Sequence, residues 1–419
     1  MPEYELSAEQ IKRKRIRLLV MSTIALLFLG LIYGFSMFAK PMIQDFGLPG
    51  VGFTFNIMMI AFCVGCTASS FAERAIGVRG CLLVAALAFA LGFCLTGLLA
   101  PRAGTIILYV CYAAIGGIGV GFGYNTIIAT TNVWFPERVG ISSGILLLGF
   151  GISSLVCGNL ALALRSILGS MQIVLIIIGL VGGGVAVVLS FMLRKPPATI
   201  VAQLAPEKLD EKGLELGEED NILKTPIFYC YYIANIVMVV VSLSVIGYAA
   251  SDASTLGAAD SFASLLVGLI STANGVARIL VGLIADRFTI KVAATFTFGV
   301  AVLASVLIVI AFSKGMLALY CIGAIMCGIS YGGSPVIGST FVRLRYGAKK
   351  YALNFSIINF ALAFGSIANI GLASALGVDN RLGIFTVICF SLVAAFALMM
   401  VFCRFWIRDV ESKMRARNE

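Results

Sequence analysis

Apolar residues occur along the chain in twelve runs, each bounded by charged residues or by clusters of Pro and Gly. Each run has about 20 residues or more, the length that an α-helix needs to cross the apolar core of a bilayer. The runs cover 17–39, 51–72, 80–100, 105–131, 139–164, 171–193, 226–249, 261–285, 291–313, 315–341, 351–376 and 382–405. This pattern predicts an all-α polytopic protein with twelve transmembrane helices in a lipid bilayer.

One hydrophilic segment, 194–224, divides the twelve runs into two sets of six. It contains Pro196 and Pro197 and charges of both signs, a composition typical of a flexible linker. We therefore expect an N-terminal six-helix half over 1–193, a cytoplasmic linker, and a C-terminal six-helix half over 225–419. The first run is too long for the apolar region of a signal peptide, so we expect it to be a retained span.

The Lys and Arg residues are distributed unevenly between the two predicted sides of the membrane. A cytoplasmic N-terminus puts 24 of the 30 on the cytoplasmic side and 5 on the other, with Arg278 alone inside a span. This bias predicts that both termini are cytoplasmic and that the chain lies in the cytoplasmic membrane. It also accounts for the net charge of +10 without a nucleic-acid partner.

The composition gives little support for catalysis or metal binding. All eleven cysteines fall inside apolar runs and the chain has no histidine. Cys63 and Cys66 form a CxxC motif, but a zinc site needs a second pair of ligands. The glycine-rich stretch GIGVGFG at 117–123 has no preceding strand, as a dinucleotide-binding loop would require. We expect a chain that is not an enzyme and that has no metal or cofactor.

The run from Ala263 to Asp286 contains Arg278 eight residues before its charged end. At about 1.5 Å per helical residue, its Cα lies roughly 12 Å inside the apolar slab. Ser271, Asn274 and Arg278 recur at spacings of three and four and share one helix face. A charge in lipid is costly, so we expect this face to line a wet cavity and to meet an anion. The alternative is that Arg278 extends to the headgroups or holds carbonyl groups of a neighbouring helix.

The two halves repeat each other. SSFAERAIGVRG at 69–80 and GLIADRFTIK at 282–291 each place an acid before Arg and then a further base. WFPERVG at 134–140 matches FVRLRYG at 341–347 at a constant offset of 207. Two repeated six-helix units around a central site are the layout of an alternating-access transporter.

The acid-Arg loops resemble the signature of the major facilitator superfamily. Within that resemblance, GGIGVGFGYNTIIATTNVWFPERVGISSGI (116–145), YGGSP (331–335) and NGVARILVGLIADRF (274–288) are similar to bacterial oxalate/formate antiporters and, more broadly, to monocarboxylate transporters. The first loop departs from the pattern at Ser69 and Glu73, and the second at Thr289.

The resemblance implies that Arg278 binds the substrate carboxylate. A guanidinium offers a planar fork of donors that suits a carboxylate, and such a pair is strong in a cavity of low dielectric constant. Oxalate/formate antiporters have a second cation at the position of Ile358, with Asn359 beside it. One fixed positive charge favours a monoanion over a dianion.

Monocarboxylate transporters often have an Asp four residues before this arginine, whereas Asn274 cannot titrate. We therefore expect exchange or facilitated transport. Any proton would move with the substrate acid or through Asp252, Asp260 or Lys40 at the outer mouth. Lys40 could also attract anions, although a lysine that simply reaches the headgroups is an alternative.

Aromatic residues are expected to wall the cavity. Tyr33, Tyr124 and Tyr331 match positions where the antiporters have Tyr or Trp, and their hydroxyls could donate to a carboxylate. Ordinary interhelical packing is the alternative for each. Phe150 stands where another cavity tyrosine is found, which fits a smaller or less polar ligand.

The loop charges are expected to control the conformational change. Glu73 with Arg74, and Asp286 with Arg287, are predicted to pair with basic groups or helix ends on the cytoplasmic side and to stabilise the outward-open state. The sequence thus predicts a carrier of small monocarboxylates, functional as a monomer. The alternatives are an exporter of amphipathic drugs, a dicarboxylate/formate exchanger, and a membrane sensor that does not transport.

Overall fold

The computed structural model describes residues 7–51, 53–197, 199–200, 204, 221–347 and 350–418. Within these ranges all regular structure is helical, and no strand is formed. Most of the predicted linker and the side chain of Asp260 lie outside what the structure describes.

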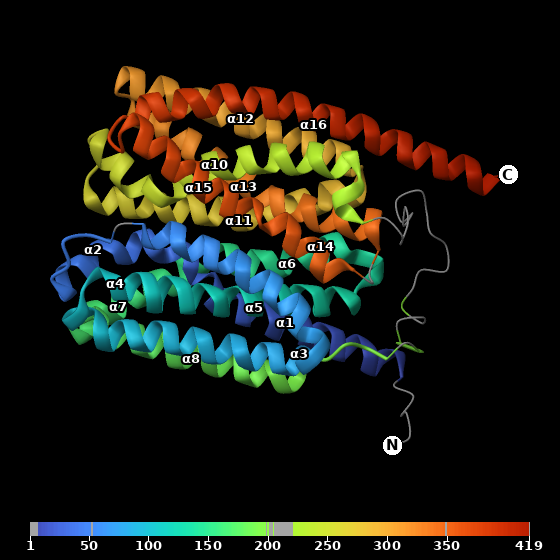
Figure 1. Ribbon diagram of the computed structural model, residues 1–419, viewed down its shortest axis with the longest axis horizontal. Helices are drawn as coiled ribbons and strands as arrows, with labels where there is room; N and C mark the ends of the chain where they lie inside the picture. Colours follow the sequence, from blue (N-terminus) through green and yellow to red (C-terminus); the bar gives the residue numbers. More distant parts are fainter. Residues whose placement is uncertain are drawn as a thin grey trace.

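The helices form two sets, which lie on opposite sides of a central plane, with both chain ends at the same end of the bundle (Figure 1). The first set is α1 (Ala8–Leu29), α2 (Phe35–Phe46), α3 (Thr54–Ala103), α4 (Thr105–Ile107), α5 (Gly116–Val133), α6 (Val139–Gly151), α7 (Asn159–Leu168) and α8 (Met171–Met192). The second set is α10 (Pro226–Thr255), α11 (Asp260–Arg287), α12 (Ile290–Lys314), α13 (Leu317–Tyr346), α14 (Tyr351–Asn359), α15 (Ala361–Leu376) and α16 (Arg381–Asn418).

The prediction of twelve spans is confirmed. Eleven stretches in the described ranges are long and apolar enough to cross a membrane, and one of them, α3, has 50 residues. Inside α3, Gly77 has φ 69° and ψ 176°, a backbone conformation that interrupts a helix and that favours glycine. Two predicted spans therefore meet at Gly77, which gives twelve.

Three spans contain irregular helical turns. The first span consists of α1, the 3₁₀ segment η1 (Gly30–Gly34) and α2. Two others contain the π-helical segments η2 (Leu108–Ile115) and η4 (Ser154–Gly158). Such irregular turns inside helices frequently mark functional positions.

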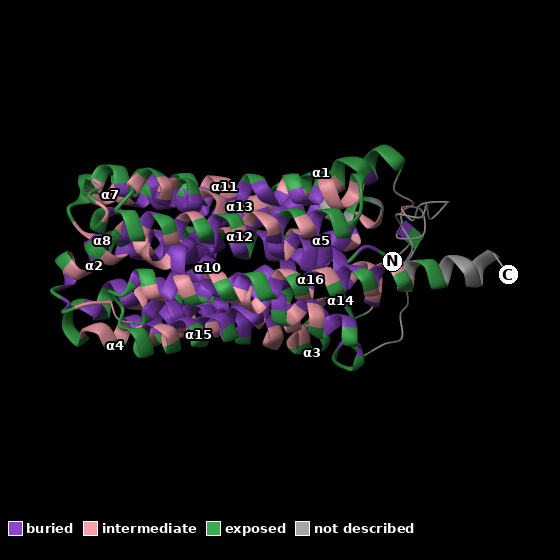
Figure 2. Cartoon of the chain, turned by 90° about the horizontal axis from the view of Figure 1, so that it is seen from above, coloured by how far each residue is buried: buried purple, intermediate pink, exposed green. Residues whose placement is uncertain are grey.

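Buried residues fill the interior of the bundle, and exposed residues cover its periphery and its ends (Figure 2). Many of the exposed side chains are large and apolar, among them Ile167 at 77%, Phe390 at 75% and Leu87 at 62% exposure. So much exposed apolar surface does not suit water, but it suits contact with lipid chains.

Glycines allow the two sets of helices to touch at α6 and α11. A Cβ on Gly151 would lie 3.0 Å from Gly275 Cα and 3.2 Å from Arg278 Nε. A Cβ on Gly144 would lie 3.1 Å from the Arg278 carbonyl oxygen. Small residues thus bring a helix of the first set directly against the arginine of the second.

Candidate anion-binding site

Breaks in the helices hold several of the predicted site residues. Tyr33 lies in the 3₁₀ segment η1, and Asn359 is the last residue of α14. Tyr331 lies in α13 four residues before Pro335. Proline has no N–H, so the carbonyl of Tyr331 loses its helical hydrogen bond. The chain is therefore locally irregular at the places where these side chains converge.

Arg278 is buried, with 1% of its surface exposed. Its Nε donates a hydrogen bond of 3.3 Å to Asn274 Oδ1, one helical turn away. Its Nη1 is also buried and has no hydrogen-bond partner among the described residues. The Phe150 ring lies 5.9 Å from Arg278 Cζ. Because protein encloses the guanidinium, the alternative in which it reaches the lipid headgroups is wrong.

The guanidinium faces a small chamber between the two sets of helices. Most of the predicted aromatic and amide side chains line this chamber, and Ile358 lines it as well. The lining is Tyr33, Phe62, Tyr124, Asn235, Val239, Arg278, Tyr331, Ser334, Pro335, Ile358, Asn359, Ala361 and Leu362. None of these residues is acidic, so no carboxylate of the lining offsets the charge of Arg278. The open volume is about 30 Å³, the share of one water molecule.

Aromatic rings close the chamber. The hydroxyls of Tyr33 and Tyr331 are 2.7 Å apart and join the two sets of helices by a hydrogen bond. The Tyr33 side chain also lies close to Arg278. Phe150 packs edge-on against Tyr33 at 5.4 Å and against Tyr124 at 4.8 Å between ring centroids. The residues predicted from sequence to surround a carboxylate thus surround the arginine.

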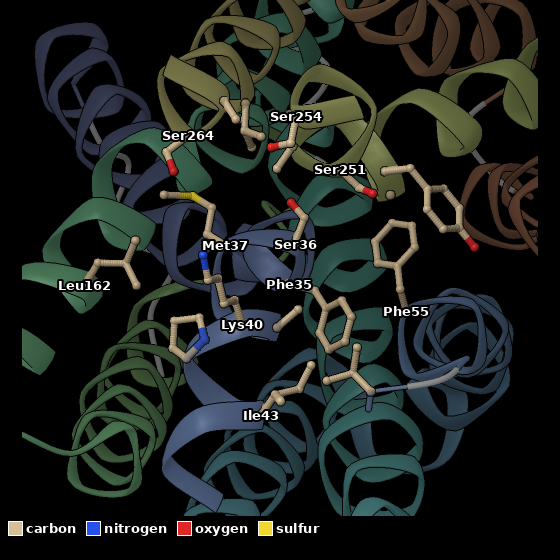
Figure 3. Close-up of a pocket in the computed structure, with 18 of the residues that line it drawn as sticks. Phe35, Ser36, Met37, Lys40, Ile43, Phe55, Leu162, Ser251, Ser254 and Ser264 are labelled. Atoms are coloured by element: carbon tan, nitrogen blue, oxygen red, sulfur yellow. The ribbon is translucent and has the colours of Figure 1, made fainter. Parts of the chain in front are cut away.

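A much larger cavity, of about 900 Å³, opens at the end of the bundle opposite the termini. Lys40 and Arg165 are its charged lining residues, and Arg165 forms an ion pair with Asp45. The Lys40 side chain extends into it beside Met37 (Figure 3). A narrow cavity that contains Asn274 shares Val267 with this vestibule and Tyr33 with the chamber. The three cavities therefore follow one another from the end of the bundle to Arg278, with Val267 and Tyr33 at the two boundaries.

On the other side of the chamber, toward the termini, uncharged polar side chains connect the two sets of helices. Asn132 Nδ2 donates to Ser143 Oγ at 2.8 Å and to the Tyr351 hydroxyl at 3.4 Å. Ser339 Oγ is 3.0 Å from Ser143 Oγ and 2.7 Å from the Tyr351 hydroxyl. This network closes the path at that end. Sequence reasoning missed this network, because its members are uncharged and come from different spans.

The four residues predicted to control the conformational change lie near this closed end. Glu73 forms an ion pair with Lys195, within the first set of helices. Asp286 lies beside the backbone of Ile141 in the first turn of α6, so it is placed between the two sets. A carboxylate at a helix N-terminus is favoured by the helix dipole. Arg74 is exposed and Arg287 is the last residue of α11.

Asp252 does not lie exposed at the outer mouth, where the sequence placed it. It is 2% exposed and faces Arg381, which is 7% exposed. Arg381 Nε and Nη2 donate to the two Asp252 carboxylate oxygens at 2.6 and 2.7 Å, and the Tyr320 hydroxyl donates at 3.1 Å. The sequence missed this pair because each residue stands near a span end, where a charge normally reaches water or headgroups.

Solved structures share this fold. The structure of the proton:xylose symporter XylE bound to 6-bromo-6-deoxy-D-glucose matches with a TM-score of 0.71 at 14% identity, over 95% of this chain and 96% of that chain. The Escherichia coli fucose:proton symporter FucP matches with a TM-score of 0.61 at 16% identity, over 92% and 97%. Identities this low show the fold alone.

Sequence relatives cover most of the chain. The uncharacterized MFS-type transporter YhjX of Escherichia coli (strain K12) is 23% identical over 361 residues, which is 85% of this chain and 87% of that protein. The oxalate:formate antiporter of Oxalobacter formigenes is 24% identical over 297 residues, 70% and 68% of the two chains. The family model of the Major Facilitator Superfamily matches residues 20–367. The chain therefore belongs to the Major Facilitator Superfamily, a family of membrane transporters.

Proposed function

We propose that this chain carries small organic monocarboxylates, of the formate, acetate, lactate or pyruvate type, by alternating access. The observation that carries the proposal is the buried Arg278, whose Nη1 has no partner among the described residues and whose chamber has no acidic lining. A buried cation without a carboxylate is unfavourable, and a bound carboxylate would neutralise it through two parallel hydrogen bonds.

The number of cations supports a monoanion. Arg278 is the charged residue of the chamber lining, and Ile358 lines the same chamber. The relative named oxalate:formate antiporter supports a carboxylate as the ligand class. A sugar, the ligand type in the names of the solved transporters, would be bound by neutral donors and acceptors and would leave the guanidinium charge unbalanced.

The cavities support a transport cycle that begins on the side opposite the termini. An anion would enter this large cavity, pass Tyr33, and displace the Tyr33–Tyr331 hydrogen bond to reach Arg278. Release on the other side would require the Asn132–Tyr351 network to open and Asp286 to leave the first turn of α6. We propose that the termini side is cytoplasmic and that a single chain completes this cycle.

The chamber favours exchange or facilitated transport over proton coupling through the protein. Its described lining holds no acid, and Asn274, the hydrogen-bond partner of Arg278, cannot titrate. Asp252 is already held by Arg381 and Tyr320. A proton would then move with the substrate acid.

The test is counterflow of radiolabelled formate, acetate, lactate and pyruvate into liposomes that contain the purified protein. We expect saturable counterflow of at least one substrate. Arg278→Ala should reduce it by about 30-fold or more, because removing one partner of a buried charge pair weakens binding by about 2–5 kcal/mol. Arg13→Gln is the matched control, since Arg13 pairs with Glu9 at an exposed site. Undiminished flux in Arg278→Ala would contradict the proposal.

A further inference from the structure

Two hydrogen-bond donors of the chamber have no partner among the described residues, and they come from different helices. One is Nη1 of Arg278 on α11, and the other is Nδ2 of Asn359, the last residue of α14. Asn359 is 6% exposed and lines the chamber together with Arg278. A buried donor without an acceptor is unfavourable, so a ligand that accepts from both groups would be favoured in this chamber.

The two donors lie on different walls of the chamber. Arg278 lies against α6, where a Cβ on Gly151 would be 3.2 Å from its Nε. Asn359 lies against α3, because its carbonyl oxygen accepts a hydrogen bond of 3.1 Å from Cys63 Sγ. A carboxylate held by two parallel hydrogen bonds presents both of its oxygens to the guanidinium. We therefore expect the Asn359 amide to donate to a different acceptor of the ligand.

Several acceptors at the site are already in use. Asn235 Oδ1 accepts from the Ser334 hydroxyl, and the Ser334 carbonyl oxygen accepts from the Tyr231 hydroxyl at 3.1 Å. Asn274 Oδ1 accepts from Arg278 Nε. These hydrogen bonds occupy acceptors of the site and leave two of its donors unused. Such an arrangement favours a ligand group that accepts hydrogen bonds and has none to donate.

We propose that the carrier selects 2-oxo monocarboxylates, such as pyruvate and glyoxylate, and that Asn359 recognises the 2-oxo group. The inference rests on the proposed function, because it takes the carboxylate to be bound by Arg278. The Asn359 amide would donate to the 2-oxo oxygen while the guanidinium holds the carboxylate. Formate and acetate have no acceptor beyond the carboxylate, and a 2-hydroxyl group adds a donor that needs a further acceptor. Ile358 and Leu362, which line the same chamber, suit the methyl group of pyruvate.

Pyruvate, lactate and propionate test this inference, because they are three-carbon monoanions that differ only at carbon 2. The half-saturating concentration of each radiolabelled acid is measured by counterflow into liposomes that contain the purified protein. We expect the value for propionate to be about tenfold above that for pyruvate, since propionate leaves the buried amide unpaired. The value for lactate should lie between the two.

Asn359→Leu removes the amide and keeps a side chain of similar size, so it should remove the difference between pyruvate and propionate. Asn354→Leu is the matched control. Asn354 lies in the same helix, is 3% exposed, and also has a buried Nδ2 without a partner among the described residues, but it is not part of the chamber lining. This control should keep the preference for pyruvate. If Asn359→Leu does not fold, the comparison of the three acids in the parent protein still tests the selection of the 2-oxo group.

Three outcomes would overturn the inference. Equal half-saturating concentrations for pyruvate and propionate would show that the site does not recognise the 2-oxo oxygen. A lower value for lactate than for pyruvate would assign the site to 2-hydroxy acids. A preference for pyruvate that persists in Asn359→Leu would place the recognition on another residue. Each of these results leaves the carboxylate site at Arg278 intact, whereas undiminished counterflow in Arg278→Ala would contradict that site itself.

Discussion

Two arginines are buried in the second set of helices, and a carboxylate faces one of them but not the other. Arg381 on α16 faces Asp252 and donates to both of its carboxylate oxygens. Arg278 on α11 faces an amide oxygen, tyrosine hydroxyls and a phenylalanine ring, and its chamber has no acid in the described lining. The fold thus places a carboxylate beside Arg381, and it places none in the described lining around Arg278.

The two positions also differ in what surrounds them. Arg381 connects α16 to the outer part of α10, where it also donates to the Ser244 carbonyl and lies 4.6 Å from the Tyr248 ring. Arg278 lies at the contact between the two sets of helices, at the inner end of the path from the vestibule. The Arg381–Asp252 ion pair lies within one set of helices, and we expect it to stay formed. Arg278 lies at the contact between the two sets, which suits a ligand that binds and is then released.

The largest effect on stability should come from breaking the permanent pair. Asp252→Ala leaves a buried guanidinium without its carboxylate, which is expected to destabilise the fold by about 3–5 kcal/mol. The midpoint of thermal unfolding in detergent measures this loss. The double variant Asp252→Leu/Arg381→Met is the control, because it removes both charges and should recover most of the stability. A midpoint unchanged in Asp252→Ala would mean that the pair contributes little.

The next largest effect should come from placing a carboxylate beside Arg278, which is expected to weaken transport. Asn274→Asp puts a carboxylate where the amide oxygen now accepts from Arg278 Nε at 3.3 Å. The internal carboxylate would compete with the substrate, and we expect carboxylate counterflow at neutral pH to fall about tenfold or more, the equivalent of at least about 1.4 kcal/mol. The loss should be smaller in acid, where the new carboxyl is protonated. Full activity at neutral pH would show that the amide does not face the ligand.

The sequence predicted the site at Arg278 and missed the pair at Arg381 for a physical reason. Charged residues are rare in the middle of transmembrane runs, so Arg278 could be recognised from its own run alone. Arg381 and Asp252 lie near span ends, and 129 residues separate them along the chain. No local pattern reports a contact of that kind. The number of spans, in contrast, follows from the lengths of the apolar runs.

The neutral network at the closed end was missed for a related reason. Asn132, Ser143 and Ser339 are polar but uncharged, and such residues occur in membrane helices without a functional role. Only the structure brings them together with Tyr351. Asp286 was predicted to pair with a basic group or a helix end because its loop repeats a recognisable pattern. It lies beside the backbone of Ile141 in α6, and its role in the conformational change stays a prediction.

Adding a second cation to the chamber should shift the preference of the carrier. Ile358 is 2% exposed and lines the chamber with Arg278. Ile358→Lys is expected to raise the ratio of dicarboxylate to monocarboxylate counterflow by about tenfold, because each added attraction of about 1.4 kcal/mol corresponds to that factor. Ile358→Met is the control for side-chain length without charge. A ratio equal in the two variants would contradict a binding site that contains position 358.

The last prediction compares the two arginines directly. It includes the smallest expected change in stability, that of Arg278→Met. Arg278→Met and Arg381→Met remove the same charge and put a similar apolar chain in its place. Arg381→Met strands the Asp252 carboxylate and should lower the unfolding midpoint strongly, whereas Arg278→Met strands no charge. Its free energy of unfolding should stay within about 1 kcal/mol of the parent, since replacing a buried charge by an apolar group is often neutral. A monocarboxylate should raise the midpoint of the parent but not of Arg278→Met. If Arg278→Met unfolded as readily as Arg381→Met, the missing anion at Arg278 would be supplied by the fold itself and not by a substrate.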